Sequence, residues 1–290
     1  MNQSIVNKKI IEDYFYQFKG YVFKYTEIRK IYKENKSAWV KENSSFEKFI
    51  KYLIKETGLK EIILEFPFRK EIRYTWENNY FYKTLMSLGT NAYVTHSTAM
   101  ELNGLIENIT NTFYVNVEQK PKKNQKQENI DKAFQNRVRV SSNIAEYDGK
   151  RICIHNGKYS RSLGVIELIK DNGELVRITD VERTLIDITV RPVYAGGVLE
   201  VLKAFKRAKG KVTIDKIVEY LIKLDYTYPY HQCVGFYLKK SGYKDSELKE
   251  LRNMGFKFDF YLEHKMNEVE YSQEWRIFYP KILTVDETIK

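Results

Sequence analysis

Between positions 180 and 191 the sequence carries a dense row of ionisable side chains. Its acidic members are Asp180, Glu182 and Asp187, and carboxylates can hold a divalent ion that activates water or stabilises a phosphoryl group. A metal-dependent nuclease or phosphatase is therefore one interpretation. However, Asp180 and Glu182 point about 200° apart on a helix, and no second acidic cluster in the sequence offers further ligands. We predict no catalytic turnover, no metal and no other cofactor.

The basic members of this row alternate with an acidic one. Arg183, Asp187 and Arg191 follow one another at four-residue spacing, which places them on one side of a helix. That helix is expected to begin at Thr179 or Asp180, whose side chains can accept hydrogen bonds from free amides, and to end before the next proline. A row of alternating sign is typical of a solvated helix face, where each pair contributes only a few tenths of a kcal/mol.

The remaining candidates for nucleophilic or metal chemistry are isolated in the sequence. His96 precedes a predicted helix cap at Ser97 or Thr98, and no nucleophile or metal ligand stands at a recognisable spacing from it. A structural role is therefore the expectation for this histidine. Cys153 and Cys233 lie far apart without a metal-binding motif, which fits a reducing cytoplasm.

The overall composition describes a folded protein with an anionic partner. The chain has 290 residues, of which 43% are hydrophobic, and its 49 Lys and Arg against 38 Asp and Glu leave a formal net charge of +11. Such an excess of positive charge favours a polyanion as partner. The sequence shows neither a signal peptide nor the roughly 18 apolar residues of a membrane span. We therefore expect a cytoplasmic protein without membrane contact.

Residues 1–76 are expected to form a domain that positions part of this charge. They contain 16 Lys and Arg against 10 Asp and Glu. Apolar residues recur at helical spacing in three segments, and the third, 44–58, begins with a capping box of Ser44 and Glu47 and ends at a glycine. Two apolar runs separated by Pro-Phe-Arg-Lys then predict a basic β-hairpin. Three helices followed by a hairpin are typical of a winged helix-turn-helix.

In such a domain the third helix can enter a major groove roughly 12 Å wide. The hairpin can contact an adjacent phosphate or the minor groove. Lysines suit phosphate contacts because a flexible ammonium binds charge with little base preference, whereas a tyrosine can contact backbone or base. The predicted DNA-binding residues are Lys30, Lys33, Lys48, Lys51, Tyr52, Lys55, Arg69, Lys70 and Arg73. The alternative is the ordinary lysine-rich surface of a small helical domain.

Residues 77–290 predict a second domain of mixed type. Short strands between 137 and 178 are separated by the turn dipeptides Asp148-Gly149, Asn156-Gly157 and Asn172-Gly173, which indicates an antiparallel sheet. Helical patterns follow from about 198 onwards. The fold class is therefore α+β, with an N-terminal winged helix-turn-helix and a mixed α/β C-terminal domain. The polar, cationic segment 118–129 predicts a loop or insertion, either solvated or a second nucleic-acid contact.

Three segments of the second domain carry a family likeness: 92–105, 178–205 and 235–243. Their most characteristic positions are Glu182, Arg183, Asp187, Arg191, Gly196 and Gly197. These segments resemble the AbiEi antitoxins of bacterial type IV toxin–antitoxin and abortive-infection systems. With the predicted winged helix, the likeness covers most of the chain.

The resemblance implies an autorepressor that binds inverted repeats in its own operator. It also implies a second domain that neutralises a nucleotidyltransferase-like toxin, often without a stable complex. The glycine-containing strand that commonly ends the family's wing is replaced here by the hydrophobic segments 65–68 and 71–76.

For the charged row, the likeness suggests anchoring: Arg183 and Arg191, flanking Asp187, would fix the helix to the sheet and to the Gly196-Gly197 turn. A ligand-sensing regulator is a further alternative, and it requires a pocket.

Overall fold

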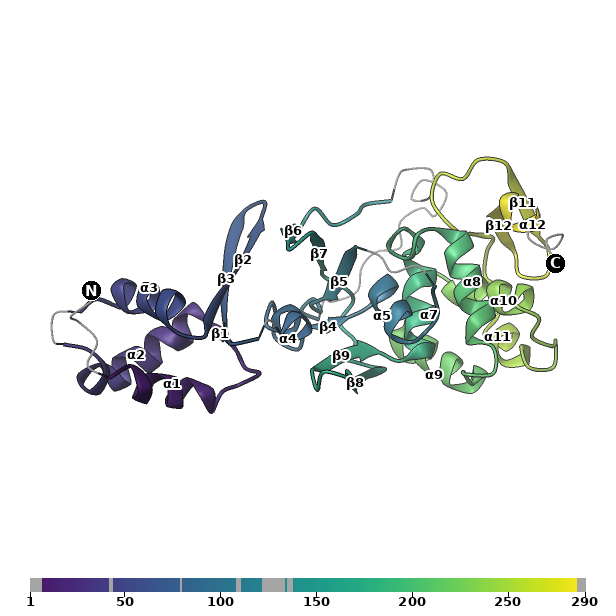
Figure 1. Ribbon diagram of the computed structural model, residues 1–290. Helices are drawn as coiled ribbons and strands as arrows, with labels where there is room; N and C mark the ends of the chain where they lie inside the picture. Colours follow the sequence, from purple (N-terminus) through teal and green to yellow (C-terminus); the bar gives the residue numbers. More distant parts are fainter. Residues whose placement is uncertain are drawn as a thin grey trace.

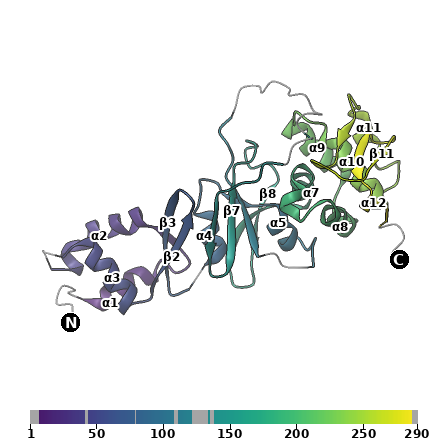
Figure 2. The same cartoon turned by 90° about the horizontal axis from the view of Figure 1, so that it is seen from above.

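The chain forms two units that meet at a β-hairpin. A computed structural model describes residues 7–41, 44–78, 80–107, 111–121, 134 and 138–285. Figure 1 shows an elongated arrangement, with a small helical unit at the N-terminal end and a larger unit containing the remaining helices at the other. The view from above in Figure 2 shows the same separation.

The N-terminal unit combines three helices with a three-stranded antiparallel sheet of order β1-β3-β2. Its elements are α1 (Lys8–Tyr16), β1 (Val22–Lys24), α2 (Tyr25–Trp39), α3 (Phe46–Glu56), β2 (Leu59–Phe66) and β3 (Arg69–Trp76). Aromatic rings fill the space between them: Phe15 stacks on Trp76 at 5.3 Å and Trp39 on Phe49 at 5.7 Å between ring centroids. The predicted helices and hairpin are thus present.

The start of α3 differs by one residue from the prediction. The main-chain N–H of Lys48 donates to Ser45 Oγ at 3.3 Å, so Ser45 caps the helix. Ser44, the predicted cap, is buried, and its carbonyl accepts a hydrogen bond from the Tyr32 hydroxyl at 2.6 Å. Both serines can cap a helix, and the contact with α2 decides which one does.

The hairpin of β2 and β3 belongs to both units. Ile62, Leu64 and Phe66 of β2 are buried in a cluster with the apolar side chains of the second unit's sheet. At the tip, Arg69 Nη1 donates to Asn143 Oδ1 at 3.0 Å. The boundary predicted at residue 76 coincides with the last residue of β3, but the apolar core continues across it.

The second unit contains a six-stranded sheet of order β6-β7-β5-β4-β9-β8. Its strands are β4 (Tyr93–Val94), β5 (Thr112–Asn116), β6 (Ile144–Tyr147), β7 (Lys150–His155), β8 (Val165–Ile169) and β9 (Leu175–Thr179). The predicted hairpins at Asp148-Gly149 and Asn172-Gly173 are confirmed as β6–β7 and β8–β9. The purely antiparallel sheet is wrong, because β4 and β5 lie between these hairpins and pair with β9 and β7 in parallel.

The helices of this unit flank the sheet, with the first of them on the side of the N-terminal unit and the others on the opposite side (Figure 1). They are α4 (Phe81–Met86), α5 (His96–Leu102), α7 (Val181–Val190), the short η1 (Pro192–Ala195), α8 (Val198–Ala208), α9 (Ile214–Leu224), α10 (Tyr230–Lys240), α11 (Lys249–Asn253) and α12 (Ile282–Val285). A second small sheet of order β10-β12-β11 joins Phe260–Tyr261, Ile277–Pro280 and Val269–Ser272. The whole is α+β, as the sequence predicts.

Helix α7 lies at the centre of this arrangement. It contacts α5, α8, α9, α10 and β9. The chain turns sharply after it through Gly196 and Gly197, whose φ angles of 90° and 98° favour glycine. On α10, a Cβ at Gly235 would lie 2.0 Å from the Trp275 ring, so only glycine permits this packing. Eight of the ten residues of α7 are buried, so the predicted charged row lies on an enclosed helix.

Candidate functional site

The charged row begins at the N-terminus of α7. Asp180 caps the helix, as predicted, by accepting from the Arg183 main-chain N–H at 2.8 Å. Its other oxygen accepts from the Tyr220 hydroxyl at 2.7 Å. The Lys216 ammonium lies 3.1 Å from Asp180 and 3.0 Å from Glu182. Burial opposes the charge on Lys216, but hydrogen bonds to the two carboxylates raise its pKa above the usual range.

The next turn of α7 holds a buried ion pair. Arg183 Nε donates to Asp187 Oδ1 at 2.8 Å, and the two residues are only 3% and 7% exposed. Arg183 Nη1 also donates to the Leu163 carbonyl at 2.8 Å, and Thr95 Oγ1 donates to Asp187 Oδ2 at 3.0 Å. Burial opposes the charge on Arg183, but the attraction of Asp187 raises its pKa. The solvated-face interpretation of this row is therefore wrong, because neighbouring elements cover it.

Arg183 anchors α7, but to a segment other than the predicted sheet and Gly196-Gly197 turn. Arg183 ties α7 to the segment before β8 through Leu163 and Ser160. Arg191 ends the helix with extended φ and is half-buried, and within the described part of the chain no acceptor lies at hydrogen-bond distance from its guanidinium. It forms no ion pair with Asp187, so the predicted three-member ladder is reduced to a pair plus a separate cation.

Two histidines and a tyrosine lie beside these arginines. His96 contacts His155 and Tyr194, with ring centroids 4.8 Å and 5.2 Å apart. Burial, with the charges of Arg191 and Arg183, lowers the pKa of His96 to about 3. Burial and the neighbouring His96 lower that of His155 to about 3 as well. Both imidazoles are therefore neutral near pH 7.

His96 also departs from its predicted position. It is the first residue of α5 after the cap at Thr95, so the predicted caps Ser97 and Thr98 are wrong and lie inside the helix. Its φ of 51° is unusual for a residue other than glycine. Strained conformations of this kind are often found at functional sites. The spacing of residues in the sequence does not predict that His96 lies beside His155 and Tyr194.

These groups line a cavity of about 800 Å³, which we call the central cleft. Its walls come from the start of α5, the segment after β7, the end of α7 and the loop between α9 and α10. The lining includes Arg183, Arg191, Lys158, Tyr159 and Tyr226. Volumes of about 300–1,000 Å³ are typical of ligand sites. The tyrosine-rich run 226–230, which supplies part of this wall, is the feature of the sequence that points to the cleft.

Two of the three carboxylates of the nuclease interpretation converge on one ammonium group, so the expectation that Asp180 and Glu182 point apart is wrong, whereas the third, Asp187, pairs with a different cation. Asp180 and Glu182 both bind Lys216, and Asp187 binds Arg183. Within the residues that the structure describes, no group of three or more His, Cys, Asp or Glu side chains is placed to hold a metal. The carboxylates that would bind a metal ion in the nuclease interpretation are instead paired with Lys216 and Arg183.

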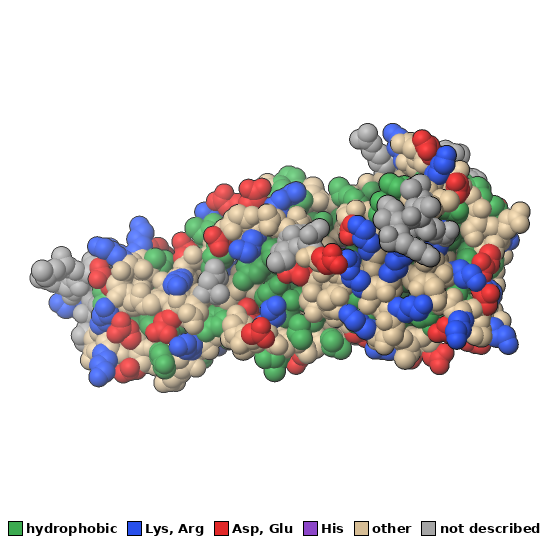
Figure 3. All heavy atoms as spheres, turned by 45° about the vertical axis from the view of Figure 1, so that its right-hand side comes forward, with side chains coloured by type: hydrophobic (Ala, Val, Ile, Leu, Met, Phe, Trp, Pro, Cys, Tyr) green, Lys and Arg blue, Asp and Glu red, His purple; other side chains and the backbone are tan. Residues whose placement is uncertain are grey.

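The predicted DNA-binding lysines of α3 share one face of the helix. Lys48, Lys51 and Lys55 are exposed, while Phe49 and Leu53 on the opposite face are fully buried. On α2, Lys30 and Lys33 are exposed, and Lys30 lies 3.8 Å from Glu34. Figure 3 shows Lys and Arg side chains on this unit with acidic ones between them. Tyr52 is half-buried against the aromatic core and contributes one edge to this face.

The predicted contacts of the hairpin fare differently. Arg73 as a DNA contact is wrong: it is 5% exposed, and its Nε donates to Ser87 Oγ at 2.8 Å while Nη1 donates to Glu71 at 3.0 Å. Arg69 bonds to Glu71 and Asn143. Lys70 is exposed and lies 3.3 Å from Glu65. The hairpin faces the second unit because its apolar side completes that unit's core.

Part of the predicted basic loop 118–129 is held in place. Glu118 accepts from the main-chain N–H groups of Ser160 and Ser162 at 3.0 Å and 3.1 Å, and from the Tyr93 hydroxyl at 3.1 Å. Residues 122–129 lie outside the described part of the chain.

For the described residues, no helix has the length and apolarity needed to cross a bilayer.

Comparison with known proteins adds a fold neighbour. The sequence matches no family model and no curated protein. The structure is similar to the crystal structure of the RV2827C protein from Mycobacterium tuberculosis, with a TM-score of 0.59 and 8% sequence identity over 92% of this chain and 89% of that one. At this identity the likeness concerns the fold alone, and it extends over both units.

Proposed function

We propose that the protein is a cytoplasmic DNA-binding regulator of antitoxin type that represses its own operon without catalytic turnover. The observation that carries this proposal is the exposed face of α3, where Lys48, Lys51 and Lys55 lie opposite the apolar side that packs into the core. Such a ridge can lie along a duplex, since flexible ammonium groups neutralise successive phosphates.

The order of elements supports a winged helix-turn-helix. The chain runs α1, β1, α2, α3, β2, β3, and α3 then occupies the position of the recognition helix. The hairpin differs from a free wing, since Ile62, Leu64 and Phe66 pack against the second unit. The proposed interface therefore comprises α3 and the exposed lysines of α2, with Lys70 at its margin.

The likeness to AbiEi antitoxins extends the proposal to the second unit. Arg183 and Asp187 of the shared motif hold α7 in place, and Gly196 and Gly197 permit the turn that follows it. In this proposal the motif stabilises a scaffold that neutralises a nucleotidyltransferase-like toxin, with or without a stable complex. Inverted repeats in the operator would bring two copies together on the DNA.

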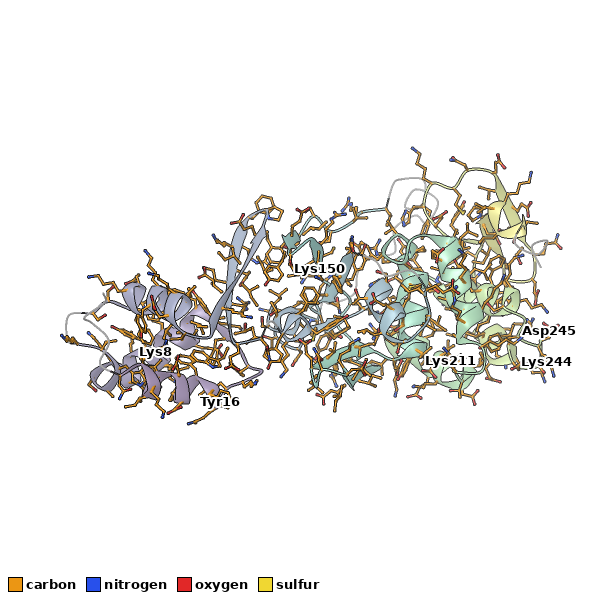
Figure 4. All side chains as sticks on the ribbon, in the orientation of Figure 1. Lys8, Tyr16, Lys150, Lys211, Lys244 and Asp245 are labelled. Atoms are coloured by element: carbon orange, nitrogen blue, oxygen red, sulfur yellow. The ribbon has the colours of Figure 1, made fainter. Side chains whose placement is uncertain are left out.

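A gel shift with the DNA upstream of the protein's own reading frame tests the proposed interface. The variant Lys51→Glu/Lys55→Glu should lose retention of this DNA, because it replaces two phosphate contacts by repulsion. The matched control is Lys211→Glu/Lys244→Glu, which changes the net charge equally on the second unit (Figure 4). If the DNA is retained equally by both variants, the DNA-binding surface does not lie on α3.

The same variant separates the two proposed roles. Deleting residues 1–76 would also remove Ile62, Leu64 and Phe66 from the second unit's core. The charge-reversal variant leaves this packing intact. When it is expressed with a toxin gene from the neighbouring reading frame, repression should be lost while growth is still protected. Loss of protection in a folded variant would show that neutralisation depends on DNA binding.

A further inference from the structure

The central cleft has the features of a ligand site that DNA binding does not use. It lies in the second unit, among α5, α7 and the loop between α9 and α10, whereas the lysines of α3 lie in the N-terminal unit (Figure 1). Its volume of about 800 Å³ is within the range of sites that enclose most of a small molecule.

The cleft contains an arginine whose guanidinium makes no hydrogen bond to the described residues. Arg191 lines it and is half-buried, and within the described residues its guanidinium has no acceptor. A guanidinium presents donors in a planar fork that matches phosphate and carboxylate oxygens. A half-buried cation of this kind favours an anionic ligand.

The other charges of the cleft do not cancel Arg191. Asp187 is engaged by Arg183 and Thr95. Lys158 donates to the main-chain carbonyl of Asp225, an acceptor without formal charge. The carboxylate of Asp225 also lines the cleft, but it is outnumbered by the cations Lys120, Arg139, Lys158 and Arg191. Since Asp187 is paired with Arg183, the wall keeps a net positive charge.

Aromatic rings lie beside this positive surface. Tyr159 lines the cleft and is 41% exposed, so part of its side chain is accessible. Tyr226 also lines it, with the Lys158 ammonium 5.3 Å from the centre of its ring. Planar heterocycles such as nucleobases commonly stack on tyrosine rings that lie next to cations. This stacking depends little on which base is bound.

One polar atom of the cleft wall lacks a partner. His155 Nδ1 is buried and makes no hydrogen bond within the described part of the chain. Buried polar atoms in native proteins are nearly always paired, and this nitrogen is an exception in the wall of the cleft. The neighbouring His96, with its φ of 51°, shows that the backbone here is held in a conformation that needs support from its surroundings.

We propose that the central cleft binds a free nucleotide, with its phosphates on Arg191 and Lys158 and its base against the exposed ring of Tyr159. The cations select for phosphate, and the ring selects for a planar base over inorganic polyphosphate. This site is separate from the face of α3 on which the proposed DNA binding depends.

Isothermal titration of the full chain with ATP, GTP, CTP and UTP tests the proposal. At least one of these nucleotides should bind, while its nucleoside and inorganic tripolyphosphate should bind more weakly. Absence of binding by all of them, or equal binding of tripolyphosphate, would overturn the proposal. Binding of an oligonucleotide alone, without any mononucleotide, would also overturn it.

Variants locate the site. Arg191→Ala should weaken nucleotide binding by about tenfold or more, since it removes hydrogen bonds to a charged group. Tyr159→Ala should weaken it by about fivefold or more through lost stacking, without changing the affinity for tripolyphosphate. Neither side chain has a hydrogen bond within the described residues that would be lost, and the unliganded melting temperature checks folding.

Two controls separate this site from the DNA-binding face. Arg29→Ala, on the exposed surface of the N-terminal unit, should bind nucleotide like the parent. Lys51→Glu/Lys55→Glu should do so as well, whatever its effect on DNA. If the α3 variant loses nucleotide binding and Arg191→Ala retains it, the nucleotide binds the DNA-binding face and the proposal for the cleft is rejected.

Discussion

Two helices of this protein carry charged residues at helical spacing, and their surroundings differ. On α3, Lys48, Lys51 and Lys55 are exposed. On α7, Arg183 and Asp187 are 3% and 7% exposed and pair at 2.8 Å. Both patterns are typical of a solvated helix face, yet only one of the two faces is solvated.

The difference arises from the number of elements that pack around each helix. The N-terminal unit has a single aromatic core, and α3 turns only its apolar side towards it. Helix α7 is contacted by α5, α8, α9, α10 and β9, so no side remains for solvent. Spacing thus determines which residues share a face, while the neighbours determine whether that face meets water.

The largest effect should follow from breaking the buried pair. Asp187→Ala leaves Arg183 as an uncompensated buried cation and should lower the free energy of unfolding by about 3 kcal/mol. Urea unfolding measures this loss, and Asp187→Asn, which keeps a similar shape, tests whether the charge is responsible. A loss below about 1 kcal/mol would mean that water reaches this pair in solution.

Acidification should destabilise the second unit selectively. The pKa of His96 is lowered to about 3 by burial and by Arg191 and Arg183, so the unfolded chain binds a proton that the folded chain does not. The contribution of neutral His96 to the free energy of unfolding is fully present above the unfolded pKa of about 6.5. It is lost as the pH falls towards 3, and the loss is on the order of 2 kcal/mol at pH 5.

Unfolding between pH 7 and pH 5 measures this dependence. His96→Asn should make it shallower, since asparagine tolerates a positive φ and does not titrate. His155, whose pKa burial also lowers to about 3, should keep part of the slope. Residues 1–76 contain no histidine, so the N-terminal unit should not contribute in this range. A slope that is equally steep in the variant would assign the acid sensitivity to other groups.

Removing charge from α3 should affect DNA binding and leave stability nearly unchanged. Lys51→Ala/Lys55→Ala should reduce the slope of log affinity against log salt concentration by about 2, at roughly 0.9 for each phosphate contact. Surface substitutions of this kind change the unfolding free energy by about 0.5 kcal/mol or less. An unchanged salt slope would show that these lysines do not contact phosphates.

The smallest effect should come from an exposed pair with the same spacing as Arg183 and Asp187. Lys30 and Glu34 lie 3.8 Å apart, with side chains 77% and 55% exposed. Glu34→Ala should change the unfolding free energy by about 0.3–0.5 kcal/mol or less. A loss comparable to that of Asp187→Ala would remove the distinction between the two helices.

Local features of the fold were predictable where one segment contains the whole cause. Helical structure from about residue 198 follows from spacing, and the start of α7 at Asp180 follows from capping; both are confirmed. The burial of Arg73 was not predictable from its own strand, because its partner Ser87 belongs to a later segment. The mixed sheet was missed for the same reason: β4 and β5 pair with strands that are distant in the sequence.

The sequence by itself determined which side chains of α3 face outward, since the opposite stripe is apolar and must leave water. It also determined the glycine turn after α7, because two successive positive φ angles favour glycine. Only the tertiary structure decided that the charged row of α7 is buried and that the central cleft exists. Both depend on segments between residues 95 and 230 that come together only when the chain packs, and local periodicity carries no information about such distant contacts.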